Sequence, residues 1–280
     1  MRVSVGDLSL FVEISGQGLP VVIGLHGGPG LDGSKLRYQL SPLANAAQIV
    51  VPDQRGHGRS DHGSAETWNL ASWAADVKSL SDALEVEHPV VLGVSFGGFV
   101  AQQYAATYPE QAAALILIST ATRFAGPDET ATRFQEVGGE AAAEVFWRSW
   151  EKPSEENAEE WRRVIGPLMS VAKQPDPMLA KLRAARVATM DVNVHFMAEG
   201  KAMDLRERLA TVRCPTLVVN GEQDPLVPPH LGREIVEAIP EHLARLEVIP
   251  DASHDVFADN PTRSYGVIRE FLASSSTVSA

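Results

Sequence analysis

The 280-residue sequence contains a single cysteine, Cys214. An intrachain disulfide is therefore impossible, and nothing in the sequence indicates an oxidising compartment. No apolar run approaches the roughly 20 residues that a membrane-spanning helix needs, and the N-terminal segment lacks the charged and then apolar pattern of a secretion signal. We therefore expect a cytoplasmic protein that does not enter a membrane.

Basic residues are also few. Lys and Arg number 24 against 36 Asp and Glu, which gives a formal net charge of −12. Because an acidic chain repels a phosphate backbone, we expect no nucleic-acid partner. The expected ligand is a small molecule, and the sequence leaves open whether the protein is a monomer or a homodimer. We expect no metal, since His57 and His62 have no third ligand at metal-binding spacing.

Short apolar runs alternate with longer helical patterns over the first 120 residues, which predicts a parallel sheet with helices on its faces. Strands are expected at 8–14, 21–25, 48–51, 90–94, 114–118, 216–219 and 243–249. Helices are expected at 68–84, 99–108, 230–239 and 257–271.

The stretch from about residue 122 to 208 is rich in Ala, Glu, Arg and Trp and has no comparable β-branched run. We interpret 122–208 as a helical cap inserted into the sheet domain. The first part of the core would then be 1–121 and the second part 209–280.

Ser95 is the candidate nucleophile. It lies in Gly-Val-Ser-Phe-Gly-Gly (93–98), with a predicted strand before it and a helical pattern after it. A serine at such a strand-to-helix turn is lifted above the sheet, and the flanking glycines let the two backbones approach closely. The motif alone occurs by chance in many proteins, so the surrounding elements carry the prediction.

A serine needs a base oriented by a third group. His254 follows the last predicted strand and is the candidate base, while Asp224 follows the strand at 216–219 and is the candidate acid. Three carboxylates nearby are rivals to Asp224, namely Glu222, Asp251 and Asp255. An acid could also follow the strand at 114–118, but Ile-Ser-Thr-Ala (118–121) supplies none, which favours Asp224.

Backbone N–H donors can stabilise the negative charge that acyl transfer places on a carbonyl oxygen. The loop His-Gly-Gly-Pro-Gly (26–30) follows the strand at 21–25. We expect the donors to be the amides of Gly28 and of Phe96, the residue after the nucleophile. We interpret His26 as a turn-stabilising side chain instead of a base, because it precedes the donors.

With these motifs, the sequence resembles the α/β-hydrolase superfamily over about residues 8–120 and 210–273. The loops at 26–30 and 53–60 (Asp-Gln-Arg-Gly-His-Gly-Arg-Ser) are similar to those of the proline iminopeptidase branch. The resemblance implies an α/β fold with a mostly parallel eight-stranded sheet flanked by helices and an inserted helical cap. It also implies cofactor-free hydrolysis through an acyl-enzyme, in which Ser95 attacks and His254 relays the proton.

The sequence departs from that branch at several positions. Phe96 stands where iminopeptidases usually have tryptophan, which leaves the backbone donor intact. Those enzymes hold a free amine with glutamates, one of them in a Glu-Asn-His-Tyr-Phe motif. The corresponding segment here, Val-Asn-Val-His-Phe (192–196), has valine at the glutamate position and Asp191 one residue earlier. Glu222 could match the second acid, so the sequence leaves open whether an amine clamp exists.

The predicted cap is rich in aromatic and sulfur-containing side chains, which together indicate an apolar substrate pocket. We expect Trp147, Trp150 and Phe196 to bind substrate.

The sequence thus predicts a serine hydrolase that acts on an ester, lactone or amide bond of a small, largely apolar substrate. A proline iminopeptidase-like peptidase is one form of this prediction. Two alternatives stay open, a hydrolase of carbon–carbon bonds in a β-diketone or dienone and a non-catalytic ligand receptor on the same fold. Haloalkane dehalogenases and epoxide hydrolases are disfavoured, because their nucleophile is an aspartate.

Overall fold

The computed structural model describes residues 1–174 and 176–275. Eight strands form one sheet in the order β1-β2-β4-β3-β5-β6-β7-β8. The pairs β1/β2 and β2/β4 are antiparallel and all the other pairs are parallel, which confirms the mostly parallel eight-stranded sheet. The strands are β1 (Arg2–Val5), β2 (Leu8–Ser15), β3 (Val21–Leu25), β4 (Gln48–Pro52), β5 (Val90–Val94), β6 (Ala114–Ile118), β7 (Thr216–Gly221) and β8 (Ala244–Ile249). Of these, β1 was not among the strands expected from the apolar runs.

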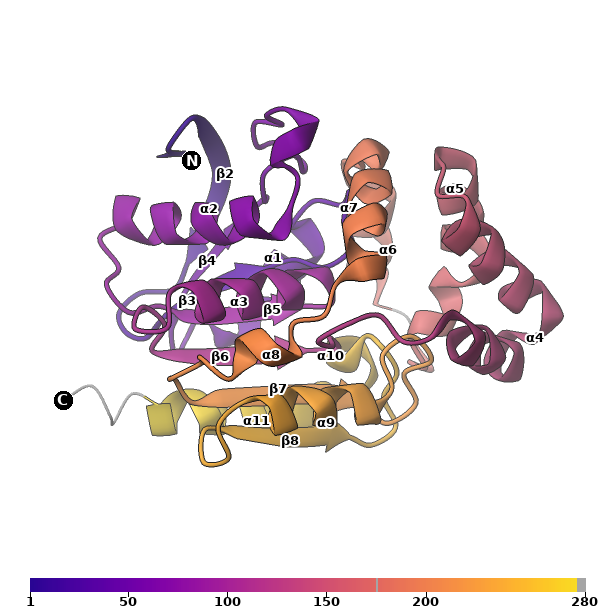
Figure 1. Cartoon of the computed structure of the whole chain (residues 1–280). Helices are drawn as coiled ribbons and strands as arrows, with labels where there is room; N and C mark the ends of the chain where they lie inside the picture. Colours follow the sequence, from indigo (N-terminus) through magenta and orange to yellow (C-terminus); the bar gives the residue numbers. More distant parts are fainter. Residues whose placement is uncertain (175, 276–280) are drawn as a thin grey trace.

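Helices cover both faces of the sheet. Figure 1 shows α2, α3, α8 and α9 in front of it. The core helices are α1 (Ser34–Leu40), α2 (Leu70–Ala83), α3 (Phe96–Thr107), α8 (Arg206–Leu209), α9 (Pro229–Ala238), α10 (Val256–Asp259) and α11 (Pro261–Ser275). Short 3₁₀ turns span Ser41–Leu43 and Ala65–Thr67.

Alternate residues of each central strand belong to different halves of the core. In β3, Ile23 and Leu25 pack in the half that contains α2, α3 and α9, whereas Val22 packs in the half that contains α1 and α11. Successive side chains of a strand point to opposite faces, so a strand covered on both sides must be apolar throughout. This is why these strands are continuous apolar runs in the sequence.

The expectation of one helix over 257–271 was wrong. The chain instead forms α10 and α11, separated at Asn260, whose backbone leaves the helical region with φ −138° and ψ 72°. Pro261 explains the break, because proline disfavours a helical conformation in the residue before it and is well accommodated at the start of a new helix.

Between β6 and α8 lie four more helices, α4 (Pro127–Glu151), α5 (Glu155–Val164), α6 (Pro177–Ala185) and α7 (Met190–Ala202), with a 3₁₀ turn at Gly166–Met169. Figure 1 shows α4 and α5 lying beyond the edge of the sheet. They share a small core of their own around Phe134, Phe146 and Ile165. The division at 122 and 208 stays a prediction, and residues 276–280 of its last segment lie outside the described part of the chain.

Within residues 1–174 and 176–275, no helix is long and apolar enough to cross a membrane.

The strand-to-helix turn after β5 depends on close backbone contact. A Cβ at Gly97 would lie 2.1 Å from the carbonyl oxygen of Leu25, and one at Gly93 would lie 2.3 Å from the carbonyl oxygen of Gly97. Both distances are far inside van der Waals contact, and neither partner is a movable side chain. These two positions therefore require glycine if α3 is to begin directly after the turn.

Alanine substitutions at Gly97 and Gly266 make a matched pair, because both glycines lie in helices. We expect Gly97→Ala to lower the free energy of unfolding by about 2 kcal/mol or more, because the added methyl group meets backbone. At Gly266 a Cβ meets no atom within 4 Å, so Gly266→Ala should raise it by about 0.5–1 kcal/mol through helix propensity. Urea denaturation followed by circular dichroism measures both, and a neutral Gly97→Ala would contradict the contact.

Candidate active site

Ser95 connects β5 to α3 with φ +52° and ψ −116°. A positive φ is strained for a residue with a Cβ, so the surroundings must hold it. The N–H of Ser95 donates to the carbonyl of Ile118 at 2.9 Å. Its carbonyl accepts hydrogen bonds from the Thr120 hydroxyl and the Gly98 N–H, each at 2.9 Å. These bonds fix the turn, and Ser95 lines a large cavity.

The structure brings the two other predicted residues together at the same cavity. His254 Nδ1 lies 2.8 Å from Asp224 Oδ2, and His254 lines the cavity with Ser95. The other Asp224 oxygen, Oδ1, accepts the backbone N–H groups of Leu226 and Val227 at 2.9 Å each. The Asp224 side chain is fully buried. Its carboxylate is thereby fixed in one orientation, with one oxygen directed at the imidazole.

Backbone contacts hold the loops that carry these two residues. The N–H of Gln223 donates to the carbonyl of Ala252 at 2.8 Å. The Ser119 hydroxyl, at the end of β6, donates to the carbonyl of His254 at 2.8 Å. Sequence reasoning examined residues 118–121 only for an acid and so missed the positioning contacts of Ser119 and Thr120. No sequence signal would have revealed them, because hydroxyl-to-carbonyl contacts have no spacing rule.

The rival carboxylates lie elsewhere. Glu222 and Asp251 are exposed. Asp255 is buried and faces Gln39 Nε2 at 2.7 Å and Lys35 Nζ at 2.8 Å. Burial raises the pKa of the Asp255 carboxyl, but Lys35, Gln39 and Arg183 together outweigh it and hold the pKa below its ordinary value. Only Asp224, among the carboxylates compared, touches the His254 ring.

The two predicted amide donors occupy different elements. Gly28 has φ +65° in the loop after β3, and its carbonyl accepts the N–H of Leu31 at 2.9 Å. Phe96 is the first residue of α3, so its N–H has no acceptor within the helix. Both residues line the cavity that contains Ser95.

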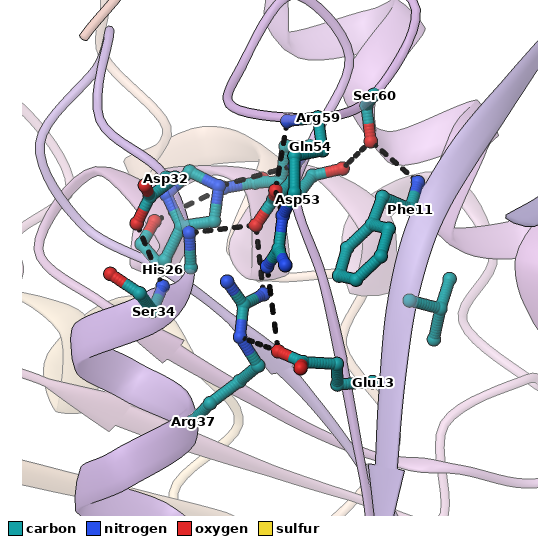
Figure 2. Close-up of polar contacts among 12 residues, drawn as sticks. Phe11, Glu13, His26, Asp32, Ser34, Arg37, Asp53, Gln54, Arg59 and Ser60 are labelled. Carbon is teal, nitrogen blue, oxygen red and sulfur yellow. Dashed lines mark hydrogen bonds and ion pairs between the residues drawn. The ribbon is translucent and has the colours of Figure 1, made fainter. Parts of the chain in front are cut away.

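His26 stabilises the turn, as expected. Its Nε2 accepts the backbone N–H of Gln54 at 3.1 Å, and the Gln54 side-chain amide donates back to the carbonyl of His26 at 3.0 Å. Figure 2 shows these reciprocal bonds between the loops that follow β3 and β4. Burial lowers the pKa of His26, which keeps its ring neutral and able to accept the Gln54 N–H.

Asp53 accepts four bonds, two from the segment that follows β3 and two from within its own loop after β4 (Figure 2). Its Oδ1 accepts hydrogen bonds from the Gly33 N–H at 2.9 Å and from Arg37 Nη1 at 2.8 Å, and its Oδ2 accepts them from the Arg59 N–H at 3.0 Å and from Arg59 Nε at 3.3 Å. Burial raises the pKa of Asp53, but these donors outweigh it, so the pKa lies below its ordinary value. The loop at 53–60, which is similar to that of the proline iminopeptidase branch, thus supports the loop that contains Gly28.

The cavity is about 970 Å³ in volume, large enough for a small organic substrate. Trp150 and Phe196 line it, although Phe196 is almost fully buried by Phe96 and its other neighbours, and their binding of substrate stays a prediction. Trp147 instead lines a separate depression on α4 with Gln135 and other polar residues, so we leave it out of the proposed substrate site. Successive residues of a helix point about 100° apart, and Phe146 takes the inward position.

The segments between β6 and α8, which correspond to the predicted insertion, are bonded to the loops of the site. The N–H of Thr189 donates to the carbonyl of Gly30 at 2.7 Å, and residue 188 pairs with residue 31 as an antiparallel bridge. On the other side, the N–H of Asp255 donates to the carbonyl of Met169 at 3.0 Å. The insertion therefore contacts both the Gly28 loop and the His254 loop directly.

Residues 20–261 match the family model of the α/β hydrolase fold, and the chain belongs to this family. It is 29% identical over 270 residues to the pimeloyl-(acyl-carrier protein) methyl ester esterase of Chromobacterium violaceum, covering 95% of this chain and 98% of that protein. It is 27% identical to the proline iminopeptidase PfmaB of Pestalotiopsis fici, covering 94% of this chain and 98% of that protein. A solved thermophilic esterase from Thermogutta terrifontis is similar with TM-score 0.74 and 28% identity, covering 98% of both chains.

His57 is a buried histidine that packs against the rings of Phe96 and Trp73, which also contact each other. Its Nδ1 lies 2.7 Å from the carbonyl of Arg55, and its Nε2 has no hydrogen-bond partner among the described residues. Burial, with the nearby His26, lowers the pKa of His57 to about 3. The folded chain therefore keeps this ring neutral under conditions in which the unfolded chain protonates it.

This difference predicts a pH dependence of stability. The stabilising contribution of neutral His57 is complete above the unfolded pKa of about 6.5 and is lost as pH falls toward about 3, at about 1.4 kcal/mol per pH unit. We expect His57→Phe to have a shallower loss of unfolding free energy between about pH 6 and about pH 4 than the wild type. Urea unfolding at several pH values measures the slope, and equal slopes in both proteins would contradict a buried neutral ring.

Proposed function

We propose that the protein is a serine hydrolase that cleaves an ester, lactone or amide bond through an acyl-enzyme. The observation that carries the proposal is the 2.8 Å contact between Asp224 and His254 at the cavity that also contains the strained Ser95. A nucleophile, a base and a group that orients the base are the three parts that acyl transfer by serine requires.

In the proposed reaction, the Ser95 hydroxyl attacks the substrate carbonyl while His254 Nε2 takes its proton. Asp224 accepts the Nδ1–H, which selects the tautomer with a basic Nε2 and stabilises the imidazolium. His254 then gives the proton to the leaving alcohol or amine, leaving an acyl group on Ser95. Water, deprotonated by the same imidazole, releases the acid and restores the enzyme. No atom or electron beyond substrate and water is needed.

The N–H groups of Gly28 and Phe96 are the proposed donors to the oxyanion. The Phe96 N–H belongs to the first turn of α3, where the helix dipole favours negative charge. Gly28 is held by its loop, which the Asp53 network ties to the end of β4. Donors fixed before the reaction stabilise the developing charge without reorganising, which is the main source of their effect.

The cavity lining supports an ester or lactone over a peptide with a free amine. Among the residues that the structure describes, no glutamate lines this cavity. Asp191 and Glu222 are the two acids of this chain that were compared with the amine-holding glutamates of proline iminopeptidases, and both are exposed. The lining is instead rich in apolar side chains such as Phe99, Phe124, Trp150, Met190 and Met197, which supports a largely apolar substrate.

Ser95→Ala tests the proposal directly. We expect it to abolish hydrolysis of p-nitrophenyl butyrate and labelling by a fluorophosphonate probe, because no other group then forms the acyl-enzyme. Ser4→Ala, the same change at an exposed strand position, serves as the control and should keep both. Hydrolysis of the butyrate ester by Ser95→Ala at the wild-type rate would exclude Ser95 as the nucleophile.

Asp224→Asn tests the orienting role. Because an amide in this position favours the wrong imidazole tautomer, we expect kcat for the butyrate ester to fall by about four orders of magnitude while the fold is kept. Asp251→Asn is the matched control, since Asp251 is an exposed carboxylate three residues before His254, and it should keep wild-type kcat. Steady-state kinetics of both variants decide which carboxylate acts, and the opposite ranking would assign Asp251.

A further inference from the structure

The charge of the cavity is opposite to that of the whole chain. The chain carries a formal charge of −12, yet the cavity is lined by five cationic side chains and three carboxylates. The cations are Lys35, Arg123, Arg162, Arg183 and Arg186, and the carboxylates are Asp32, Asp176 and Asp255. A local excess of cations within an acidic protein indicates selection of an anionic ligand.

The three carboxylates already have partners. Asp32 accepts the N–H groups of Ser34 at 2.9 Å and of Val187 at 2.7 Å. Asp176 accepts the Tyr38 hydroxyl at 2.8 Å and caps α6. Asp255 is paired with Lys35. Asp255 is thus engaged by a cation, whereas Asp32 and Asp176 accept neutral donors and keep their charge, so the lining still holds two more cations than carboxylates.

Three arginines from the insertion form a cluster that we call the arginine group, comprising Arg162, Arg183 and Arg186. Arg183 is 3.6 Å from Asp255, which already pairs with Lys35. Among the described residues, no carboxylate forms an ion pair with Arg162 or Arg186. Burial, and then repulsion by the other two arginines, lowers the pKa of Arg186. Three cations held together in this way repel each other, and an anion between them would remove that cost.

Contacts of the neighbouring residues link two members of the arginine group to the loops of the proposed reaction centre. Directly after Arg186, residues 187–189 bond to the loop 30–32 that follows Gly28. Asp255, which contacts Arg183, follows His254 in the chain. At the shared cavity, Arg186 is therefore next to the segment bonded to the loop of the proposed oxyanion donor, and Arg183 is next to the loop of the proposed base.

We propose that the arginine group is an anion-binding subsite that holds a free carboxylate of the substrate while Ser95 attacks a second, esterified or lactonised carbonyl. The inference rests on the proposed hydrolase function and names its substrate class as monoesters or lactones of short dicarboxylic acids. Arginine suits this role because its planar guanidinium binds a carboxylate through two parallel N–H donors. The apolar lining would contact the carbon chain between the two carbonyls.

The test compares mono-p-nitrophenyl glutarate with p-nitrophenyl pentanoate, whose acyl chains have equal length and differ only in the terminal carboxylate. We expect the wild type to favour the glutarate ester in kcat/KM by about tenfold or more. Arg186→Gln and Arg162→Gln should each lower this preference ratio by about tenfold. Arg163→Gln is the matched control, because Arg163 is the neighbour of Arg162 on α5 with a 74% exposed side chain, and it should keep the wild-type ratio.

A second measurement follows binding without catalysis. Trp150 and Trp161 line the cavity, so glutarate should change the tryptophan fluorescence of Ser95→Ala in a saturable way, and adding Arg186→Gln should weaken binding by about tenfold. Inorganic phosphate is titrated in parallel. Tighter binding of phosphate than of glutarate would overturn the carboxylate assignment.

The two proposals fail in different ways. Hydrolysis of both esters without preference, with a ratio unchanged in Arg186→Gln, would overturn the anion subsite and leave the hydrolase intact. Saturable glutarate binding that depends on Arg186, in a wild type that hydrolyses neither ester, would support the subsite and overturn the hydrolase.

Discussion

The site depends on one buried carboxylate, that of Asp53. Its side chain has no exposed surface, and a charge removed from water must be compensated by donors. Asp53 obtains them from Gly33, Arg37 and Arg59, which lie in different segments. Two of these donors come from the segment after β3, so they hold that segment against the loop after β4 (Figure 2). The position of Gly28 is a consequence of that requirement, and so is the point at which the insertion bonds to residues 30–32.

A second constraint is the strain at Ser95. Its positive φ is maintained by glycine contacts on one side and, on the other, by the Ser95 N–H bond to the β6 carbonyl of Ile118 and the hydrogen bond that Thr120 donates. Strain of this kind costs of order 1–3 kcal/mol and persists only where the surroundings over-determine the backbone. Both constraints act at the carboxyl ends of parallel strands, where the loops of an α/β sheet converge. Packing of side chains elsewhere in the sheet offsets the free-energy cost of the strained and buried charged positions.

Much of this arrangement could be predicted from the sequence. Buried parallel strands are apolar runs in the sequence, so the sheet could be predicted. A serine between such a strand and a helix lies in a recognisable motif, so the turn at Ser95 could be predicted too. His254 and Asp224 followed because strand ends converge, and the structure places them in contact. The arginine group could not be predicted, because its members lie on α5, on α6 and in the loop after α6 and meet only through the tertiary fold. The direction of Trp147 was missed for a similar reason, since aromatic content does not say which helix face turns inward.

The contrast between an acidic chain and a cationic cavity bears on substrate selection. At physiological ionic strength, charges separated by more than about 8 Å of solvent are largely screened, so most of the 36 acidic side chains have little influence inside the cavity. Partly buried charges are screened far less, and Arg186 is half-buried. The charges that line the cavity, five cations against three carboxylates, therefore set most of the potential that a bound substrate experiences. A free amine would be repelled there and a carboxylate attracted, which is the opposite of what an amine clamp requires.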